Sequence, residues 1–304
     1  MRVEKGPESS SISLVCVAPA KVNLLLGVST QVVEGRHRLD TVLSTIDLAD
    51  RLLFTFDAKS ARRVTLRLDT ALGIDSLELP IEQNLVYRAV EALERSSGRR
   101  LEGHLDIVIE KHLPIEAGLA GGSSDAAATL GALATLWGLE PLEAPLLAAA
   151  HQLGSDVAFF LHGGCALMGG AGEMLVRRLP MPSLDLVLVK PAQGISTAAA
   201  YAAFDNDPQP AVEAARLVEL LEAKAAAPQL ASALANNLYP AAQSLLPEVG
   251  ELIDELRAAP QVHAALLTGS GSTVYGVCKS AKAAAALAQH FIHQGHWAQP
   301  CKTR

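Results

Sequence analysis

Cysteine is scarce in this sequence, and its few copies form no motif. Four of the 304 residues are cysteines, at positions Cys16, Cys165, Cys278 and Cys301. None belongs to a CxxC pair, and none has a companion histidine at the spacing of metal ligands. We therefore expect free thiols in a reducing compartment, with no disulfide bond and no zinc site.

Long apolar runs are also missing. The first 21 residues, MRVEKGPESSSISLVCVAPAK, hold too short an apolar run for a signal peptide. No later run is long enough to cross a bilayer without a charge. We therefore expect a cytoplasmic protein with no membrane partner.

A surplus of positive charge is absent as well. The formal net charge is −7 at pH 7, which argues against a nucleic-acid surface and does not favour an anionic membrane. With 50% hydrophobic and 19% charged residues, the chain can bury a large core and split into two domains. We expect it to act on a small molecule, with no nucleic acid, as a monomer or a weak homodimer.

Two standard nucleotide-binding motifs are not present either. The P-loop pattern requires a lysine directly before its final serine or threonine, and no lysine precedes Ser123 in the one glycine-rich loop that resembles it. The dinucleotide fingerprint GxGxxG does not fit the sequence GLAGGSS. Any nucleotide that binds here is therefore held in a different way.

The central feature that is present is a glycine-rich loop that runs into a helix. The loop, GLAGGSSD, begins at Gly118, and an alanine- and leucine-rich run with strong helix propensity continues to Leu136. Before the loop, residues His104 to Lys111 alternate apolar and polar side chains and predict a strand. Glycines let the backbone approach a ligand, and the unpaired N–H groups of a helix start favour an anion. The pattern therefore predicts a phosphate site.

The rest of the chain mixes predicted strands and helices. Alternation predicts strands at residues 12–17 and 22–28 on either side of a break at Pro19, and at 51–56, 63–68, 184–190, 264–267 and 273–278. Helical spacing predicts helices after the N-cap Asn84 and at 142–153, 195–204, 211–227, 248–259 and 281–292. A hairpin is expected over 166–178. Because the order lacks the regular period of a doubly wound sheet, we favour an α+β fold. The boundary lies at the linker 179–182, with domains at 1–180 and 181–304.

Three polar clusters outside the loop each allow two interpretations. Lys21 and Asn23 interrupt a buried stretch, either as a strand end with a snorkelling lysine or as functional side chains. The basic stretch Arg36–Arg38 fits a solvated turn or a binding site. Asp156 caps the helix that follows it, or Ser155 caps that helix and leaves Asp156 free to point into a cleft.

Three segments of the chain together resemble the GHMP small-molecule kinases, the superfamily of galactokinase, homoserine kinase and mevalonate kinase. Residues 114–127 (PIEAGLAGGSSDAA) resemble its signature P-x3-G-L-x-G-G-S-S, and residues 18–24 (APAKVNL) and 267–272 (LTGSGS) match its first and third motifs in order and spacing. The resemblance covers nearly the whole chain. It implies a two-domain α+β architecture, with an N-terminal domain like domain 2 of ribosomal protein S5, a ferredoxin-like C-terminal domain, and a cleft between them where nucleotide and substrate meet.

Within the superfamily, PAKVN and the LGSDV around residue 155 are most similar to one branch. Its members use ATP to phosphorylate the 2-hydroxyl of a methylerythritol that carries a cytidine diphosphate, in the non-mevalonate route to isoprenoids. The alternatives are a kinase for another small alcohol, of the homoserine or mevalonate type, and a non-catalytic ligand-binding relative. Retention of both Lys21 and Asp156 argues against the latter, because a binding module does not need that pair.

The resemblance also implies roles for individual residues. Asp156 would be the base or orienter of the attacking hydroxyl, and Lys21 its cationic neighbour. Asn84 and Lys111 would lie near the nucleotide, and a loop serine would bind Mg²⁺, Ser124 or its neighbour Ser123. The residues that would surround the ATP phosphates are Pro114, Ile115, Glu116, Ala117, Gly118, Leu119, Ala120, Gly121, Gly122, Ser123 and Ser124. On the substrate side, the resemblance implies Asn23 at the erythritol hydroxyls, His37 at the cytosine edge, Tyr201 stacked on the base, and further contacts from Arg36, Thr268, Gly269 and Ser270.

The sequence departs from the family pattern at four positions. Arg36 stands where the family usually has a tyrosine, and a guanidinium can also stack on a base. Ala158 replaces a proline, and Glu116 and Ala117 replace two glycines of the loop. A glutamate at position 116 places a negative charge near a phosphate site unless its side chain points outward.

Overall fold

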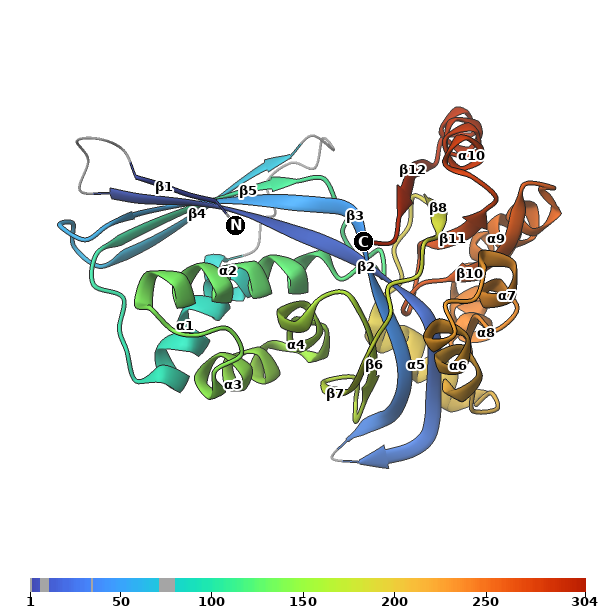
Figure 1. Cartoon of the computed structure of the whole chain (residues 1–304), viewed down its shortest axis with the longest axis horizontal. Coiled ribbons are helices and arrows are strands. Elements are labelled where there is room, and N and C mark those ends of the chain that lie inside the picture. The colour runs from blue at the N-terminus through green and yellow to red at the C-terminus, as the bar shows by residue number, and fades with distance from the viewer. Residues whose placement is uncertain (1, 6–10, 34, 71–79) are drawn as a thin grey trace. The chain divides into compact units, whose positions relative to one another are not determined.

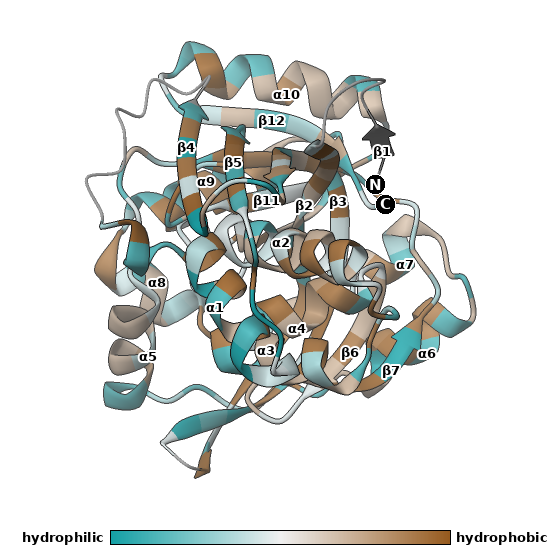
Figure 2. Cartoon of the chain, turned by 90° about the vertical axis from the view of Figure 1, so that its left-hand side faces the viewer, coloured by the Kyte–Doolittle hydropathy of each residue, from teal (hydrophilic) through white to brown (hydrophobic). Residues whose placement is uncertain are grey.

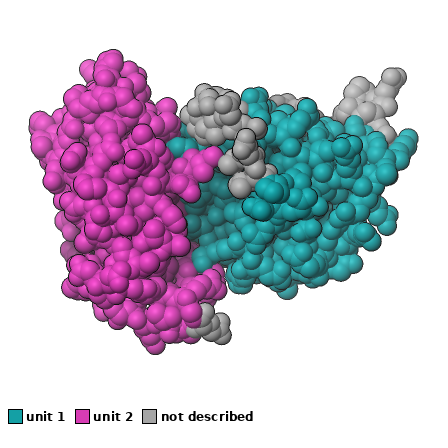
Figure 3. Space-filling view, turned by 180° about the vertical axis from the view of Figure 1, so that it is seen from behind, with its two compact units in different colours: residues 1–20, 48–114, 120–162 teal, residues 21–47, 115–119, 163–304 magenta. Residues whose placement is uncertain are grey.

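The computed structural model describes residues 2–5, 11–33, 35–70 and 80–304. It divides the chain into two compact units, coloured separately in Figure 3. Unit one comprises residues 1–20, 48–114 and 120–162, and unit two comprises residues 21–47, 115–119 and 163–304. The units alternate along the sequence, so the glycine-rich loop contributes residues 115–119 to unit two and the residues from Ala120 onward to unit one.

Unit one is a sheet with helices packed against it (Figure 1). The strand order is β1 (Arg2–Lys5), β2 (Ser11–Val33), β3 (Arg36–Asp57), β5 (His104–Lys111) and β4 (Arg63–Thr70), and the two long strands β2 and β3 continue into unit two. β5 runs antiparallel to β3 and parallel to β4. Its alternate residues Leu105, Ile107, Ile109 and Lys111 are buried, so the period of a strand carries a lysine onto the core face.

The helices of unit one follow the predicted ones with two differences. They are α1 (Leu85–Ser97), α2 (Gly121–Trp137), α3 (Ala144–Leu153) and α4 (Ser155–His162), with a short 3-10 turn, η1, at Ile81–Gln83. The helix expected over 142–153 begins at Ala144, and the helix near Asp156 contains both Ser155 and Asp156, so neither residue precedes it as a cap. The side chain of Asn84 accepts a hydrogen bond from the Val86 N–H, which confirms the predicted N-cap. Gly138, in a left-handed conformation, ends α2. Figure 2 shows α4 as mostly hydrophobic, and its Val157, Ala158 and Phe159 are buried.

Unit two contains a four-stranded antiparallel sheet in the order β10 (Val262–Leu267), β11 (Val274–Cys278), β8 (Asp185–Lys190) and β12 (Trp297–Lys302). Helices α9 (Glu248–Ala258) and α10 (Ala281–His293) pack against it, with Leu256, Phe291, Val187 and Val274 in the shared core. The remaining elements of unit two are β6 (Cys165–Gly169), β7 (Met174–Leu179), β9 (Ala235–Asn236), α5 (Thr197–Asn206), α6 (Ala215–Glu222), α7 (Ala227–Ala231) and α8 (Tyr239–Leu245).

The structure corrects two expected elements. No break occurs at Pro19, because β2 continues from Ser11 to Val33 and the fixed φ of proline is compatible with an extended strand. The helix expected over 211–227 is confined to α6, because Lys224 adopts a left-handed φ of 52° and ends it. The pattern also did not predict β12, whose Pro300 weakens the strand signal but is tolerated on the edge of a sheet.

Within the part of the chain that the structure describes, no helix is both long and apolar enough to cross a membrane. All four cysteines are free thiols.

Candidate functional site

In unit two, Lys21 is a buried lysine whose ammonium donates to oxygen atoms of Asn23 and Gly118. It lies on β2 with 3% of its surface exposed. Its Nζ donates to Asn23 Oδ1 at 2.7 Å and to the Gly118 carbonyl oxygen at 2.9 Å. The interpretation as a snorkelling lysine is therefore wrong, since the side chain does not extend to solvent and the ammonium points at the glycine-rich loop.

A network of hydrogen bonds joins Asn23 to the late TGSGS turn. The backbone N–H of Asn23 donates to Thr268 Oγ1 at 3.2 Å, and Asn23 Nδ2 donates to Thr41 Oγ1 at 3.0 Å. Thr268 Oγ1 lies 3.4 Å from both Asn23 Oδ1 and the Gly118 carbonyl oxygen. The Tyr275 hydroxyl donates to the Asn23 carbonyl oxygen at 2.9 Å. The first motif, the third motif and the first half of the loop therefore meet within one unit.

Glycine is required at position 118 for two reasons. Its φ of 71° is left-handed, and a Cβ atom there would lie 2.2 Å from the Thr268 carbonyl oxygen. Gly269 of the turn, with a φ of 58°, lies against Gly118, and a Cβ on Gly269 would be 3.2 Å from the Gly118 carbonyl oxygen and 3.3 Å from Lys21 Nζ. The loop and the turn thus contact each other through their backbones, and the Thr273 N–H donates to the Ala117 carbonyl oxygen at 3.3 Å.

Glu116 points away from the loop toward the segment after β8. Its side chain is exposed, and its Oε2 would lie 2.9 Å from a Cβ placed on Gly194. Burial lowers the pKa of the nearby Lys190, whereas the charge of Glu116 raises it. The carboxylate therefore faces a lysine and solvent, which is the outward orientation that a phosphate site requires.

In unit one, Lys111 lies between two buried carboxylates at the end of β5. Its Nζ is 2.5 Å from Asp50 Oδ2 and 2.9 Å from Asp125 Oδ2. The other oxygen of Asp50 accepts the N–H groups of His112 at 2.6 Å and Leu113 at 2.9 Å. Asp50 thus fixes both the lysine and the backbone that enters the loop.

Burial controls the charge of this cluster. The pKa of Asp125 is raised to about 7, because burial, the largest cause, and the neighbouring Asp50 raise it by more than Lys111 lowers it. The same two carboxylates raise the pKa of Lys111 against the opposing effect of burial. The lysine therefore remains an ammonium at neutral pH.

The start of α2 presents two oxygen atoms that lack a partner. Ser124 Oγ and Asp125 Oδ1 are buried, and neither has a hydrogen bond among the described residues. Ala120 precedes the helix in a left-handed conformation with a φ of 57°, and it offers no side-chain cap. Buried oxygens without a partner are uncommon in folded proteins, so these two atoms distinguish the start of α2.

The remaining predicted residues fall into both units. Asp156, in unit one, is half-buried in the first turn of α4, and Asn84 caps α1 in the same unit. In unit two, the rings of His37 and Tyr201 lie side by side with centroids 5.4 Å apart, and Arg36, which precedes His37, is exposed. Ser270 Oγ lies 3.0 Å from Thr197 Oγ1.

Sequence reasoning missed several polar residues of these networks. Asp205 Oδ1 lies 3.1 Å from His37 Nε2, while His37 Nδ1 is 2.8 Å from the Ser29 carbonyl oxygen. Asp50, Thr41 and Asn236 were also not predicted. Their partners Lys111, Asn23 and Leu267 lie 61, 18 and 31 residues away, so no local pattern marks them. The adjacent amides Asn236 and Asn237 are the one visible signal, since they stand together in an apolar stretch.

Comparison with known proteins defines the class. The model of the GHMP kinases N terminal domain matches residues 84–164, and that of the GHMP kinases C terminal domain matches residues 211–295. A solved homoserine kinase from Cytophaga hutchinsonii, 20% identical, has the same fold with a TM-score of 0.73 over 100% of this chain and 97% of that chain. The chain belongs to the GHMP kinases, so it is a small-molecule kinase with the two-domain α+β fold that the motifs predicted.

More similar relatives share one name. A protein of Pelotomaculum thermopropionicum named 4-diphosphocytidyl-2-C-methyl-D-erythritol kinase is 39% identical over 91% of this chain and 93% of its own length. The protein of that name from Bacillus subtilis is 35% identical over 86% of each chain. A crystal structure of 4-(cytidine 5'-diphospho)-2C-methyl-D-erythritol kinase, 32% identical, superposes with a TM-score of 0.74 over 96% of this chain and all of that one.

Proposed function

We propose that this chain transfers the terminal phosphoryl group of ATP to the 2-hydroxyl of 4-diphosphocytidyl-2-C-methyl-D-erythritol, a step in the synthesis of isoprenoid precursors. The observation that carries the proposal is the identity of 35 to 39% with kinases of that name along most of the chain. Solved mevalonate kinases and homoserine kinase share the fold at only 13 to 20% identity, so they support the class and not an alternative substrate.

We assign the chemistry at the acceptor hydroxyl to two residues. Asp156 would orient the hydroxyl and accept its proton, and Lys21 would balance the negative charge of the transferring phosphoryl group. The hydrogen bonds from Lys21 to Asn23 and Gly118 support this role, because they hold a desolvated ammonium in one orientation before any substrate binds. In a loose phosphoryl-transfer transition state, such positioning contributes more than proton abstraction.

We propose that residues Pro114 to Ser124 surround the ATP phosphates. The left-handed backbone at Gly118 and Ala120 and the free N–H groups at the start of α2 support an anion site. Asn84 and Lys111 would line the nucleotide side. The Asp50 contacts support this role for Lys111 because they fix the strand end from which the loop departs.

Mg²⁺ would accompany the nucleotide, with the hydroxyl of Ser124, or that of Ser123, as a protein ligand. The residues present fit this ion, since Ser124 Oγ and Asp125 Oδ1 are buried oxygens without a partner in the described part of the chain. Oxygen is the donor that Mg²⁺ prefers, and the bound ion would supply neutralisation of the phosphate charge.

We assign substrate recognition to unit two. His37 would read the cytosine edge and Tyr201 would stack on the base, with Arg36 as a second stacking group, and the 5.4 Å spacing of the two rings supports a shared aromatic subsite. Asn23 would contact the erythritol hydroxyls. The turn residues Thr268, Gly269 and Ser270 would complete the acceptor side.

The test is turnover by the purified protein. ADP release is measured with Mg-ATP and each of three alcohols, the cytidyl substrate, homoserine and mevalonate. We expect turnover with the cytidyl substrate alone. Turnover on homoserine or mevalonate, with none on the cytidyl compound, would overturn the assignment. Light scattering during size-exclusion chromatography of the same preparation checks the proposed monomer or weak homodimer.

A further inference from the structure

The side-chain amide of Asn236 donates both of its N–H groups to the backbone of the TGSGS turn, a contact that we call the clamp. Its Nδ2 donates to the carbonyl oxygens of Leu267 and Gly269, both at 2.9 Å. Its Oδ1 accepts the Leu238 N–H at 2.9 Å. One side chain therefore holds the backbone on both sides of Thr268.

The clamp acts on the residue that joins three motifs. The Thr268 hydroxyl bonds to the backbone N–H of Asn23 and lies 3.4 Å from the Gly118 carbonyl oxygen, which also accepts from Lys21. A displacement of the turn would therefore move the partner of Asn23 and the oxygen atom that orients the Lys21 ammonium.

Asn236 is itself anchored to the strand that carries Lys21. β9 pairs in parallel with β2, with Leu25 opposite Ala235 and Leu26 opposite Asn236. The next residue, Asn237, accepts from the Val28 N–H at 2.8 Å and donates to the Val28 carbonyl oxygen at 2.9 Å. The two adjacent amides thus connect β2 to the turn, because Asn237 bonds to Val28 of β2 and Asn236 bonds to the turn.

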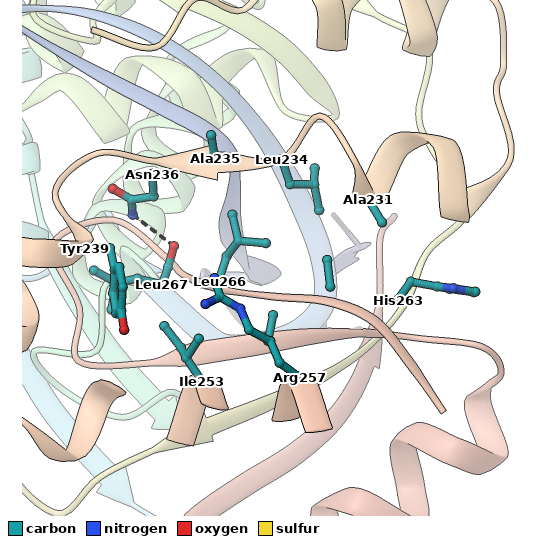
Figure 4. A pocket seen from close by; sticks show the side chains of 12 residues that line it. Ala231, Leu234, Ala235, Asn236, Tyr239, Ile253, Arg257, His263, Leu266 and Leu267 are labelled. Carbon is teal, nitrogen blue, oxygen red and sulfur yellow. Dashed lines mark hydrogen bonds between the residues drawn. The ribbon is translucent and has the colours of Figure 1, made fainter. Parts of the chain in front are cut away.

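Packing does not fix the position of Asn236 on every side. It lines a cavity of about 380 Å³ together with Tyr239, Arg257, Leu266 and others, and Figure 4 shows its amide directed at Leu267. Because open space lies against the side chain, the hydrogen bonds of its amide, and not packing alone, hold it on the turn.

We propose that Asn236 is a positioning residue for phosphoryl transfer, which acts through Thr268 on the acceptor side of the site. This inference rests on the proposed function for the identity of the acceptor. Asn236 does not contact the substrate, and its contribution is to keep the Thr268 hydroxyl and the Gly118 carbonyl oxygen where Asn23 and Lys21 need them.

The first test is the near-isosteric change Asn236→Asp. It retains the acceptor for Leu238 but replaces two donated hydrogen bonds with a carboxylate that faces two carbonyl oxygens. We expect kcat/KM for the acceptor alcohol to fall by about 10- to 100-fold, as for the loss of buried hydrogen bonds. We expect kcat to fall and the KM of the alcohol to rise, whereas the KM of ATP stays unchanged. The control Gln289→Glu makes the same amide-to-carboxylate change at an exposed position of α10 and should leave all three constants unchanged.

The second test is a double-mutant cycle with Thr268→Ala. If Asn236 acts through Thr268, the change at position 236 costs far less in a chain that already lacks the Thr268 hydroxyl. A purely structural amide would lower the melting temperature, and its effects on kcat/KM would add to those of Thr268→Ala, which would overturn the proposal. Asn236→Ala removes the donors without adding a charge and replaces Asn236→Asp in the cycle if the latter does not fold.

Failure of this inference is distinct from failure of the proposed function. The cycle is run with whichever alcohol the wild-type protein phosphorylates. Turnover of homoserine or mevalonate instead of the cytidyl substrate overturns the substrate assignment but leaves a measurable effect at Asn236. Wild-type kinetics in both Asn236 variants would overturn the positioning role alone.

Discussion

The ammonium of Lys111 lies 2.5 Å from the carboxylate of Asp50, a residue 61 positions earlier in the chain. Asp50 is fully buried and also accepts two backbone N–H groups at the entry to the glycine-rich loop. The carboxylate of Asp50 thus compensates the buried charge of Lys111 and accepts the backbone N–H groups that follow the end of β5. The stability of unit one and the geometry of the loop therefore depend on the same side chain.

Asp50→Asn should lower the free energy of unfolding by about 3 kcal/mol, because removal of one partner leaves a buried ion pair incompletely compensated. Chemical denaturation measures this loss. The matched control is Asp254→Asn, since Asp254 is 75% exposed and 4.0 Å from Arg257. We expect the control to change stability by less than about 0.5 kcal/mol. Equal effects of the two substitutions would contradict the role of Asp50.

Gly118→Ala should reduce kcat/KM at least tenfold by our estimate, because the new Cβ displaces the loop from the Thr268 carbonyl oxygen and with it the acceptor of Lys21. Gly138→Ala provides the control. Gly138 also has a left-handed φ, of 62°, but a Cβ there meets no atom within 4 Å. It should cost about 1 kcal/mol of stability and no activity. Steady-state kinetics and thermal melting of both variants separate the two effects.

Asp156→Asn should abolish nearly all turnover while ATP binding persists, because the amide neither orients the hydroxyl as a charged acceptor does nor takes its proton. A thermal-shift titration with ATP reports binding independently of catalysis, since a ligand of the native state raises its melting temperature. An unchanged rate would show that another residue orients the acceptor.

Two buried thiols, those of Cys165 and Cys278, should lower the free energy of unfolding at alkaline pH. Burial raises the pKa of Cys165 to about 12 and that of Cys278 to about 11, above the value of about 8.5 expected in the unfolded chain. The native state therefore retains protons that the unfolded state releases, so the free energy of unfolding falls as pH rises above about 8.5.

The check is denaturation at pH 8 and pH 10 for the wild type and for Cys165→Ala combined with Cys278→Ala. The double variant should lose less stability between the two pH values. An equal loss would show that the two thiols do not titrate differently on folding. At pH 8, a thiol reagent should modify both cysteines slowly in the native protein and rapidly in guanidinium.

Sequence patterns predicted the elements whose signals are local. Asn84 was identified as an N-cap because the residue type and the helical spacing after it suffice, and the glycine-rich loop was found because it runs directly into α2. Pro19 was misread as a break because propensity was weighed without the buried neighbours that keep β2 extended. The resemblance of three motifs to those of the GHMP kinases predicted the class of protein.

The rest of the candidate site depends on contacts between distant residues. The partners of Thr268 lie 150 and 245 residues away, and those of Asn236 are backbone N–H and carbonyl groups that any sequence would provide. The burial of Asp50 and the orientation of Glu116 depend on how their segments pack. No single-sequence pattern contains that information, so these contacts and orientations were found only in the structure.

The hydrogen bond between Asn23 and Thr268 has a consequence for biosynthesis. The ribosome adds about 5–20 residues per second, so Asn23 leaves it tens of seconds before its partner is made. The carbonyl oxygen of Gly118, which accepts from Lys21, is made partway through that interval, and the Thr268 hydroxyl, which accepts from the backbone N–H of Asn23, is made only at its end. The segment around Lys21 therefore completes its native hydrogen bonds only late in translation, after the third motif has been made.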